Sequence, residues 1–392
     1  MFRIVVLLCF LIISISRFAV AQNQPAMNFD IKQIERDRGV IKAADGFLAD
    51  QPITVTASKN PRSAGGLHDF SSEGDYWWPD PAKPDGPYIQ KDGMTNPDNF
   101  VEHRHAMIRM SIHVAAVTSA YRITGEDKYA QAAIKHLHAW LVDPQTLMNP
   151  NLQYAQAIKG VSTGRGIGII DTVHLIEVAR SAQLLEKAGQ LKGEDLAATK
   201  KWFADYLNWM TTSKNGNDEM NAANNHGTCF AMQVAAFASF VGDQKLLEMV
   251  RQRYKEVLLP KQMADDGSFP QELRRTKPYG YSIFNADAMA TLCWIASSPQ
   301  DNLWEFTTPD GKNFRKAVEY IHPFIKDKST WPLKPDVMFW EFWPVRSPVL
   351  LFGGLAYHEP KFLETWKSLE ANPTNEEVIR NLPIRYPVLW VE

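Results

Sequence analysis

Apolar residues recur every three or four positions along most of this chain, from about Arg104 toward the C-terminus. Met107, Met110, Val114 and Val117 form one such series, and this is the spacing of an amphipathic helix. The same period predicts helices over residues 168–186, 196–210, 226–241, 244–258, 282–296 and 314–325, and two shorter ones after Pro348 and Glu359. Helices therefore dominate the predicted structure.

Short polar connections separate these predicted helices. Gly125-Glu126-Asp127 and Gly242-Asp243 are examples, and connections this short place consecutive helices antiparallel, as hairpins. Repeated hairpins predict an all-α fold, an (α/α) toroid built as an incomplete barrel with long structured loops. We expect one domain over residues 22–392 that begins with an irregular extension, and a strand pattern at residues 53–57 alone.

The N-terminus has the pattern of a signal peptide. Arg3 precedes an apolar run over residues 4–15, and Ala19-Val20-Ala21 supplies small residues for cleavage near Ala21. Arg17 interrupts the run before it reaches the roughly 20 residues that a membrane span requires. Residues 1–21 therefore predict a periplasmic or secreted protein without a membrane span.

Composition narrows the possible partners and cofactors. Beyond the predicted signal peptide, Cys229 and Cys293 are too few for a disulfide framework and lack the clustered spacing of a zinc site, so we expect buried thiols. We expect no metal and no cofactor. A net charge of −2 gives no global field that would attract a polyanion, which argues against nucleic-acid binding. An anionic partner would need a local basic cleft.

A stretch rich in tryptophan and proline, residues 76–99, has the composition of a long structured loop. Trp77 and Trp78 suit stacking on the faces of sugar rings, although tryptophans that fill the core would give the same pattern. Arg165 lies in a second polar, glycine-bearing stretch that precedes a predicted helix and suits contact with a sugar.

Two motifs carry the chemistry. Asn224-Asn225-His226 introduces the predicted helix 226–241, and a charged run ends in Tyr279-Gly280-Tyr281 just before the predicted helix 282–296. The cations of that run are Arg274, Arg275 and Lys277. In a toroid, both motifs would lie on one rim.

These side chains fit β-elimination at a 4-linked uronate. The C5 proton of a uronate is poorly acidic while the adjacent carboxylate is charged, so the enzyme must neutralise the carboxylate, remove the proton and protonate the leaving O4. Asn, Arg and His side chains suit the first task. A tyrosine whose pKa is lowered by neighbouring cations would suit proton transfer.

Three segments together resemble the alginate lyase superfamily, whose members have the (α/α) toroid fold. They are Asn224-Asn225-His226, the run from Phe269-Pro270-Gln271-Glu272 to Tyr281, and Trp77-Trp78-Pro79-Asp80-Pro81, in similar order across about residues 65–350. His226 and Tyr281 stand 55 positions apart, close to the separation of the family's catalytic histidine and tyrosine. The resemblance implies an acidic polysaccharide as substrate.

The resemblance also implies roles. Tyr281 would be the catalytic acid, and the base for one uronate epimer. His226 would be the base for the other epimer or a carboxylate neutraliser, and Asn225 would bind the carboxylate. Arg275 is favoured slightly over Arg274 as the arginine. The remaining residues expected to bind substrate are Arg274, Asn224, Lys277, Tyr279, Trp77, Trp78 and Arg165.

Alternatives remain open at this level. Gly227-Thr228-Cys229 replaces a bulkier Ser-aromatic run of the alginate lyases, which leaves glucuronan or another polyuronate as a possible substrate. An inverting glycoside hydrolase would instead use two carboxylates, with candidates at Asp75, Asp80, Asp98, Glu102 and Asp171. A non-catalytic sugar-binding protein would require the tryptophan-rich loop alone.

Overall fold

A computed structural model describes residues 29–392 of the chain. The predicted signal peptide, residues 1–21, lies outside the described residues. The described helices are α1 (Ile31–Asp37), α2 (Val40–Phe47), α3 (Glu102–Thr124), α4 (Asp127–Leu141), α5 (Leu175–Lys187), α6 (Gly193–Thr212), α7 (Lys214–Met220), α8 (Asn225–Val241), α9 (Gln244–Arg253), α10 (Leu259–Gln262), α11 (Pro270–Leu273), α12 (Pro278–Ala296), α13 (Phe314–Lys326), α14 (Pro348–Ala356), α15 (Pro360–Ser368) and α16 (Glu376–Arg380).

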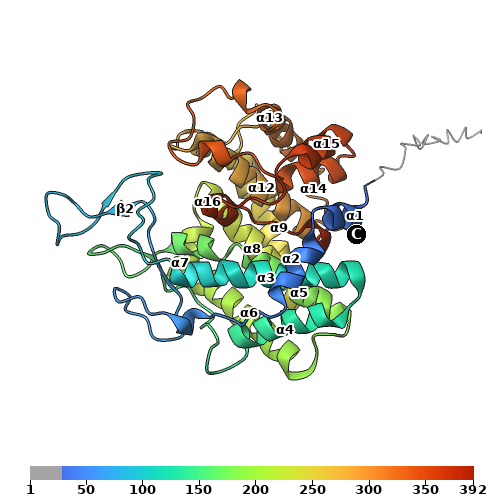
Figure 1. Ribbon diagram of the computed structural model, residues 1–392. Coiled ribbons are helices and arrows are strands. Elements are labelled where there is room, and N and C mark those ends of the chain that lie inside the picture. The colour runs from blue at the N-terminus through green and yellow to red at the C-terminus, as the bar shows by residue number, and fades with distance from the viewer. Residues whose placement is uncertain (1–28) are drawn as a thin grey trace, which may run out of the picture.

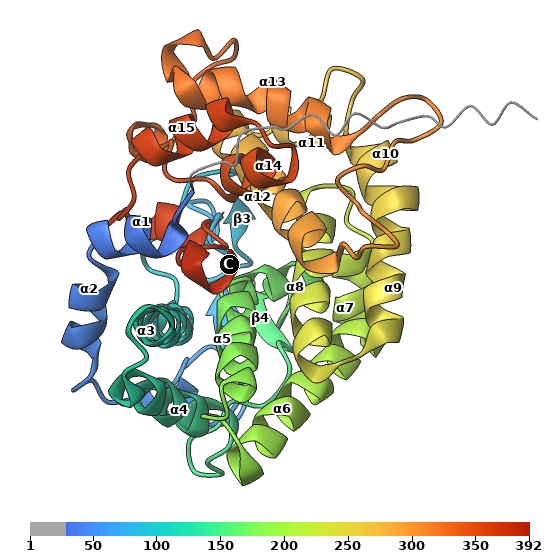
Figure 2. The same cartoon turned by 90° about the vertical axis from the view of Figure 1, so that its right-hand side faces the viewer.

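The helices form two concentric layers of an all-α toroid. Helices α3, α5, α8, α12 and α14 contact one another in that order and make the inner layer, as Figure 2 shows. The outer layer packs α4 on α3, α6 and α9 on α8, and α13 and α15 on α14. The C-terminal turn Pro387–Leu389 packs against α3 and α5 and lies near the middle of the ring. The predicted toroid is confirmed.

Three of the inner helices, α8, α12 and α14, are apolar on nearly all sides because neighbours surround them. In α8, residues such as Phe230, Val234 and Phe237 are fully buried, and a single cluster of buried apolar side chains extends from Ile31 to Val391. Cys229 and Cys293 belong to this cluster as free, buried thiols. No helix within residues 29–392 combines the length and apolar character needed to cross a bilayer.

Two short two-stranded sheets complete the described secondary structure. Strands β1 (Ser71–Glu73) and β4 (Tyr154–Ala157) pair in parallel, and β2 (Trp77–Trp78) and β3 (Ile89–Gln90) pair antiparallel. The β2–β3 hairpin projects from the helical body at the left of Figure 1. The predicted loop over residues 76–99 therefore contains a hairpin.

Several predicted boundaries were wrong for local reasons. Residues 53–57 do not form a strand but contain the 3-10 turn Val55–Ala57. The helix expected from residue 168 begins at Leu175, after the 3-10 segment Gly166–Thr172. Within that segment, Gly168 packs against Ala155 too closely for a side chain. Helix α12 begins at Pro278, four residues before the predicted start, so Tyr281 lies in its first turn.

One buried carboxyl of α12 makes the fold sensitive to pH. Asp287 is fully buried, accepts hydrogen bonds from the Ser347 hydroxyl and the Val349 N–H, and leaves its Oδ2 without a partner. Burial raises the pKa of Asp287 to about 7. The pKa of Asp287 is higher in the folded protein than in the unfolded chain. Its contribution to the free energy of unfolding is therefore fully present below pH 4 and is lost as pH rises through 7.

We expect Asp287→Asn to remove this dependence. Between about pH 5 and pH 8, the free energy of unfolding of the wild type should fall by roughly 3 kcal/mol relative to the variant. Urea unfolding at both pH values measures the difference, with Asp265→Asn at an exposed position as the control. The prediction would be contradicted if the free energies of unfolding of the wild type and Asp287→Asn differed by the same amount at both pH values.

Candidate active site

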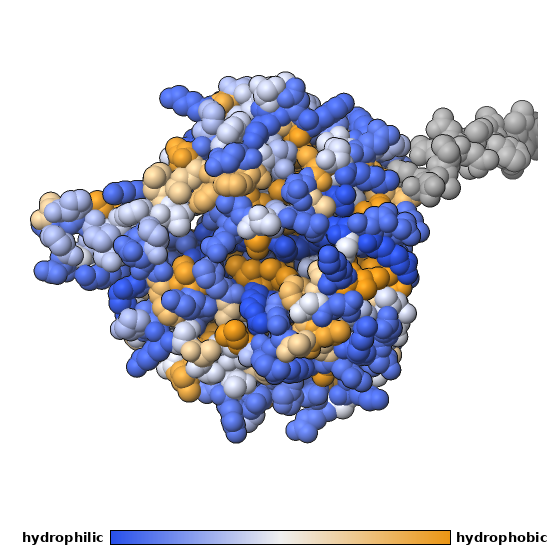
Figure 3. Space-filling view, viewed as in Figure 1, coloured by the Kyte–Doolittle hydropathy of each residue, from blue (hydrophilic) through white to orange (hydrophobic). Residues whose placement is uncertain are grey.

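A polar cavity of about 430 Å³ opens where the first turns of α8 and α12 face the base of the β2–β3 hairpin. Seven residues predicted from the sequence line it together: Trp77, Arg165, Asn224, Asn225, His226, Arg275 and Tyr281. On the same side of the molecule, Figure 3 shows the hairpin as a largely hydrophilic arm next to a hollowed surface. The cavity thus lies at the rim that the sequence predicted.

Local sequence explains why both helices begin at this cavity. The Asn224 side chain accepts a hydrogen bond from the His226 N–H and caps α8. Pro278 occupies the first turn of α12, and Asp336 accepts hydrogen bonds from the N–H groups of Tyr279 and Gly280, both at 2.9 Å. These caps hold His226 and Tyr281 in first turns that face one space.

His226 is oriented by a carboxylate that the sequence reasoning missed. Its Nδ1 lies 2.8 Å from Glu219 Oε1, and the Glu219 side chain on α7 is fully buried. Since a ring nitrogen bound to a carboxylate carries the proton, Nε2 is left with its lone pair. The His226 side chain is 17% exposed, which leaves that edge accessible from the cavity.

Asn225 is held by a second missed carboxylate, Glu272 on α11. The Asn225 N–H donates to Glu272 Oε1 and its Nδ2 donates to Oε2, both at 2.7 Å. Burial raises the pKa of Glu272, while the two hydrogen bonds from Asn225 oppose that change. Asn225 Oδ1 has no partner among the described residues. The Asn225 amide is therefore fixed in one orientation at the cavity wall.

Replacing Glu272 with glutamine should disturb this amide. The glutamine keeps one oxygen that can accept a hydrogen bond from Asn225. Its N–H₂ group, however, faces the other donor of Asn225, either the backbone N–H or Nδ2, and cannot accept from it. We expect kcat to fall by up to about 10²-fold, because small misplacements of substrate-positioning groups cost that much. Steady-state kinetics and thermal unfolding measure this, with Glu256→Gln at an exposed position as the control. A folded variant with unchanged kcat would show that Asn225 needs no anchoring.

The Tyr281 hydroxyl lies at the centre of a dense polar group. It is 2.7 Å from the Tyr76 hydroxyl and accepts a hydrogen bond from Arg275 NH2 at 3.1 Å. The pKa of Tyr281 lies well above its ordinary value, chiefly because the side chain is buried and Tyr76 adjoins it. Lys277 and Arg275 oppose this shift without reversing it. The expectation of a lowered pKa was wrong, and the Tyr281 hydroxyl keeps its proton at neutral pH.

Arg275 points into the cavity and Arg274 does not. Arg275 donates to both oxygens of Asp92, with its NH2 2.7 Å from Oδ1 and its Nε 3.3 Å from Oδ2, and its guanidinium lies 4.2 Å from the centre of the Tyr281 ring. Arg274 is exposed, and its Nε donates to the Pro270 carbonyl. Of the two arginines, Arg275 is the one placed to meet a ligand beside Tyr281.

Three other predicted residues lie outside the cavity. The Lys277 ammonium is buried behind Tyr281 and pairs with Glu377 at 2.6 Å. The Tyr279 ring is fully buried, and its hydroxyl donates to the Phe324 carbonyl. Trp78 donates from Nε1 to the Met94 carbonyl within the hairpin. Their positions suit support of the cavity wall and the hairpin.

Arg165 is a cavity cation with few neutralising neighbours. Its Nε donates to the Gln156 carbonyl at 2.8 Å, and its guanidinium lies 5.7 Å from the centre of the Trp77 ring. Among residues 29–392, no carboxylate lies within ion-pair distance of Arg165. Burial lowers the pKa of Arg165 to about 10, so it stays charged at neutral pH. An incoming anion would meet a positive charge that is not engaged in an ion pair.

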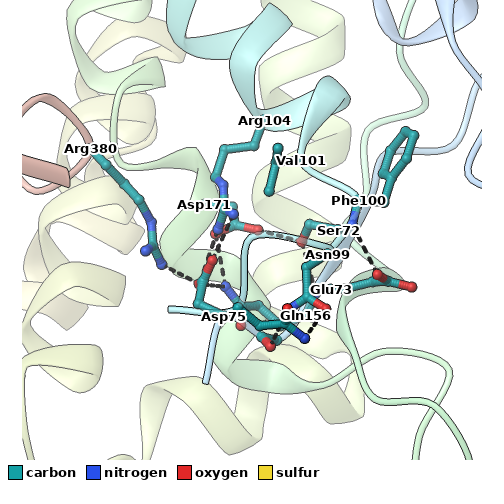
Figure 4. A network of polar contacts seen from close by, with 12 residues as sticks. Ser72, Glu73, Asp75, Asn99, Phe100, Val101, Arg104, Gln156, Asp171 and Arg380 are labelled. Carbon is teal, nitrogen blue, oxygen red and sulfur yellow. Dashed lines mark hydrogen bonds and ion pairs between the residues drawn. The ribbon is translucent and has the colours of Figure 1, made fainter. Parts of the chain in front are cut away.

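A buried ionic network supports the cavity floor, and Figure 4 shows its arrangement. Arg104 on α3 binds Asp75 at 2.7 Å and Asp171 at 3.4 Å, and Arg380 on α16 binds Asp75 at 2.6 Å. Gln156 donates to both carboxylates. Arg104 and Arg380 hold the pKa of Asp75 well below its ordinary value although it is buried.

This network weighs against the hydrolase alternative. An inverting hydrolase needs one carboxylic acid with a raised pKa. Asp75 has a lowered pKa, and Asp171 is committed to Arg104, Gln156 and the Ser72 hydroxyl. Within the described part of the chain, no three His, Cys, Asp or Glu side chains are grouped as a metal site.

The rim of this toroid of helical hairpins brings together a protonated tyrosine, a histidine bound to a carboxylate, an anchored amide and a guanidinium. Fold and site together define the class of this protein: it is a toroid enzyme of the polysaccharide lyase type. The family follows from comparison with known proteins. The Alginate lyase family model matches residues 54–331, and the chain belongs to this family.

Solved structures agree with that assignment. An alginate lyase from Bacteroides ovatus superposes with a TM-score of 0.79 at 31% sequence identity, over 92% of this chain and 96% of that one. Alginate lyase A1-III from Sphingomonas species A1 matches at 16% identity with a TM-score of 0.52, over 90% of this chain and 94% of that one. A variant of A1-III in complex with a tetrasaccharide gives 15% identity and a TM-score of 0.56, with the same coverage. The two A1-III matches support the fold. A search of curated proteins gave no match.

Proposed function

We propose that this lyase cleaves 4-linked uronate polymers of the alginate type by β-elimination, without a metal. The observation that carries the proposal is the convergence of Tyr281, Arg275, Asn225 and His226 on one cavity, with Arg275 NH2 3.1 Å from the Tyr281 hydroxyl. Each of the three chemical requirements of β-elimination has a matching group in this set.

The first requirement is to neutralise the uronate carboxylate. Arg275 and the anchored Asn225 amide lie on the same cavity wall as His226, and both carry N–H donors. Hydrogen bonds from these donors would stabilise the negative charge that develops on the carboxylate when the C5 proton leaves. Arg165 adds a positive charge that no described carboxylate approaches within ion-pair distance.

The second and third requirements are proton transfers. In the proposed reaction, His226 Nε2 removes the C5 proton of one uronate epimer, a C4=C5 double bond forms, the bond from C4 to O4 breaks, and Tyr281 protonates O4. The raised pKa of Tyr281 suits an acid. For the other C5 epimer, Tyr281 would carry out both transfers, but it must first lose its own proton to solvent, as a phenolate that the hydrogen bond from Arg275 would stabilise. The phenolate would then take the C5 proton and return it to O4.

Substrate contacts beyond the reacting sugar are assigned to Trp77, Arg165 and Asn224, which line the cavity. The A1-III variant that binds a tetrasaccharide supports an oligosaccharide as the ligand of this fold. As part of the same proposal, residues 1–21 direct the protein to the periplasm or the exterior, and residues 22–392 act as one domain.

The test is ultraviolet absorbance, because β-elimination creates a double bond conjugated with the carboxylate. Purified protein is incubated with polymannuronate, polyguluronate and glucuronan, with and without a chelator. Absorbance that grows on an alginate block despite the chelator supports the proposal. Growth on glucuronan alone would reassign the substrate, and new reducing ends without absorbance would indicate a hydrolase.

A further inference from the structure

Each cation around Tyr281 is paired with an acid, but these acids differ in burial and in the part of the fold that carries them. Lys277 pairs with Glu377, and Arg380 pairs with both Asp75 and Glu377. These acids belong to the supporting network. Arg275 is different, because its partner Asp92 belongs to the projecting hairpin segment and is 32% exposed in the cavity, whereas Asp75 and Glu377 are buried.

Asp92 binds Arg275 in the geometry that the carboxylate of a ligand would adopt. It takes the edge formed by Nε and NH2 with both of its oxygens, at 3.3 and 2.7 Å, and Oδ2 also accepts from the Thr276 hydroxyl at 3.0 Å. Two parallel N–H···O bonds from one guanidinium edge are the usual geometry of carboxylate recognition by arginine. The pKa of Asp92 is lowered by these contacts with Arg275 against the opposing effect of burial, so the carboxyl is ionised.

The next residue shows how closely the hairpin approaches at this point. Gly93 has φ +75°, and a Cβ there would overlap the side chain of Thr276. The ion pair between Asp92 and Arg275 and this tight backbone contact therefore hold the hairpin to the start of α12. The charge that Arg275 would offer to a substrate is meanwhile balanced within the protein.

We propose that Asp92 competes with the substrate carboxylate for Arg275, so that a uronate must displace it to reach the guanidinium edge next to Tyr281. This inference rests on the proposed lyase function. Two carboxylates on one guanidinium edge would repel each other in a partly buried site, so occupation by Asp92 weakens binding of substrate and product alike. Weaker uniform binding favours release of a polyanionic product without slowing the chemical step.

Asp92→Asn tests this competition, with Asp85→Asn as the matched control. Asp85 is on the same hairpin, exposed, and makes no ion pair with a described residue, so its substitution changes the charge equally. We expect KM for the preferred alginate block to fall about tenfold in Asp92→Asn, with no increase in kcat, and no change in Asp85→Asn. Asp92→Glu retains the carboxylate and should keep KM at or above the wild-type value.

Calorimetric titration with an alginate tetrasaccharide, in the Tyr281→Phe background, provides a readout without turnover. Asp92→Asn should lower Kd about tenfold there. If the wild type forms the conjugated product but Asp92→Asn leaves KM and Kd unchanged or raises them, the competition is overturned while the lyase function stands. If the wild type forms no conjugated product from any polyuronate, the proposed function fails and the inference fails with it.

Discussion

Replacing Tyr281 with phenylalanine is expected to reduce kcat on every alginate block by a factor of about 10²–10⁴, the usual contribution of a positioned acid or base. The hydroxyl lies 3.1 Å from Arg275 NH2 in the cavity, and its raised pKa keeps the proton that the leaving O4 requires. The measurement is the initial rate of absorbance increase at saturating substrate. KM should change little, because the ring and the neighbouring Arg275 remain.

The natural control is Tyr279→Phe, two positions earlier on the same helix. The Tyr279 hydroxyl donates to the Phe324 carbonyl, away from the cavity. Its loss should cost about 1 kcal/mol of stability and leave kcat within a few-fold of the wild type. Should Tyr279→Phe abolish turnover while Tyr281→Phe retains it, the assignment of the acid would be reversed.

Local patterns in the sequence were sufficient to locate much of the site. The Asn224-Asn225-His226 run is a cap followed by an apolar helix, so the first turn of α8 could be placed without knowing its neighbours. The helical period likewise predicted the inner helices and hence the toroid. Arg275 lies three residues before α12 and Tyr281 lies in its first turn, so their nearness in the sequence already made a contact between them possible.

The orienting carboxylates could not be predicted in the same way. Glu272 reaches Asn225 across 47 positions and Asp92 reaches Arg275 across 183, so their pairing depends on how distant segments pack. Glu219 is only seven positions before His226, but it lies on α7, a short helix without a clear apolar period. The one available signal for Glu219 was its position, as an acidic residue just before the capping run Asn224-Asn225-His226.

The error about the pKa of Tyr281 has a related cause. The sequence shows which cations are near Tyr281, and these lower the pKa of a phenol. It does not show that Lys277 and Arg275 are themselves paired with Glu377 and Asp92, nor that the phenol is buried against Tyr76. Burial and pairing are properties of the folded chain, and here they outweigh the charges that the motif displays.

Replacing His226 with glutamine should distinguish the two C5 epimers. Mannuronate and guluronate present the C5 proton on opposite faces of the ring, and a base on one wall of the cavity can reach one face. We expect turnover of one block to fall by about 10² or more and turnover of the other block to fall much less, because Tyr281 remains for the second epimer. Parallel assays on polymannuronate and polyguluronate measure the ratio.

The contact with Glu219 sharpens this expectation. Glu219 Oε1 lies 2.8 Å from Nδ1, so Glu219→Gln keeps the imidazole but weakens its preference for one tautomer and one orientation. This variant should show the same epimer bias as His226→Gln, to a smaller degree, whereas His105→Gln at an exposed position should show none. Equal losses on both blocks in His226→Gln would instead mean that His226 binds the carboxylate, since both epimers need that carboxylate neutralised.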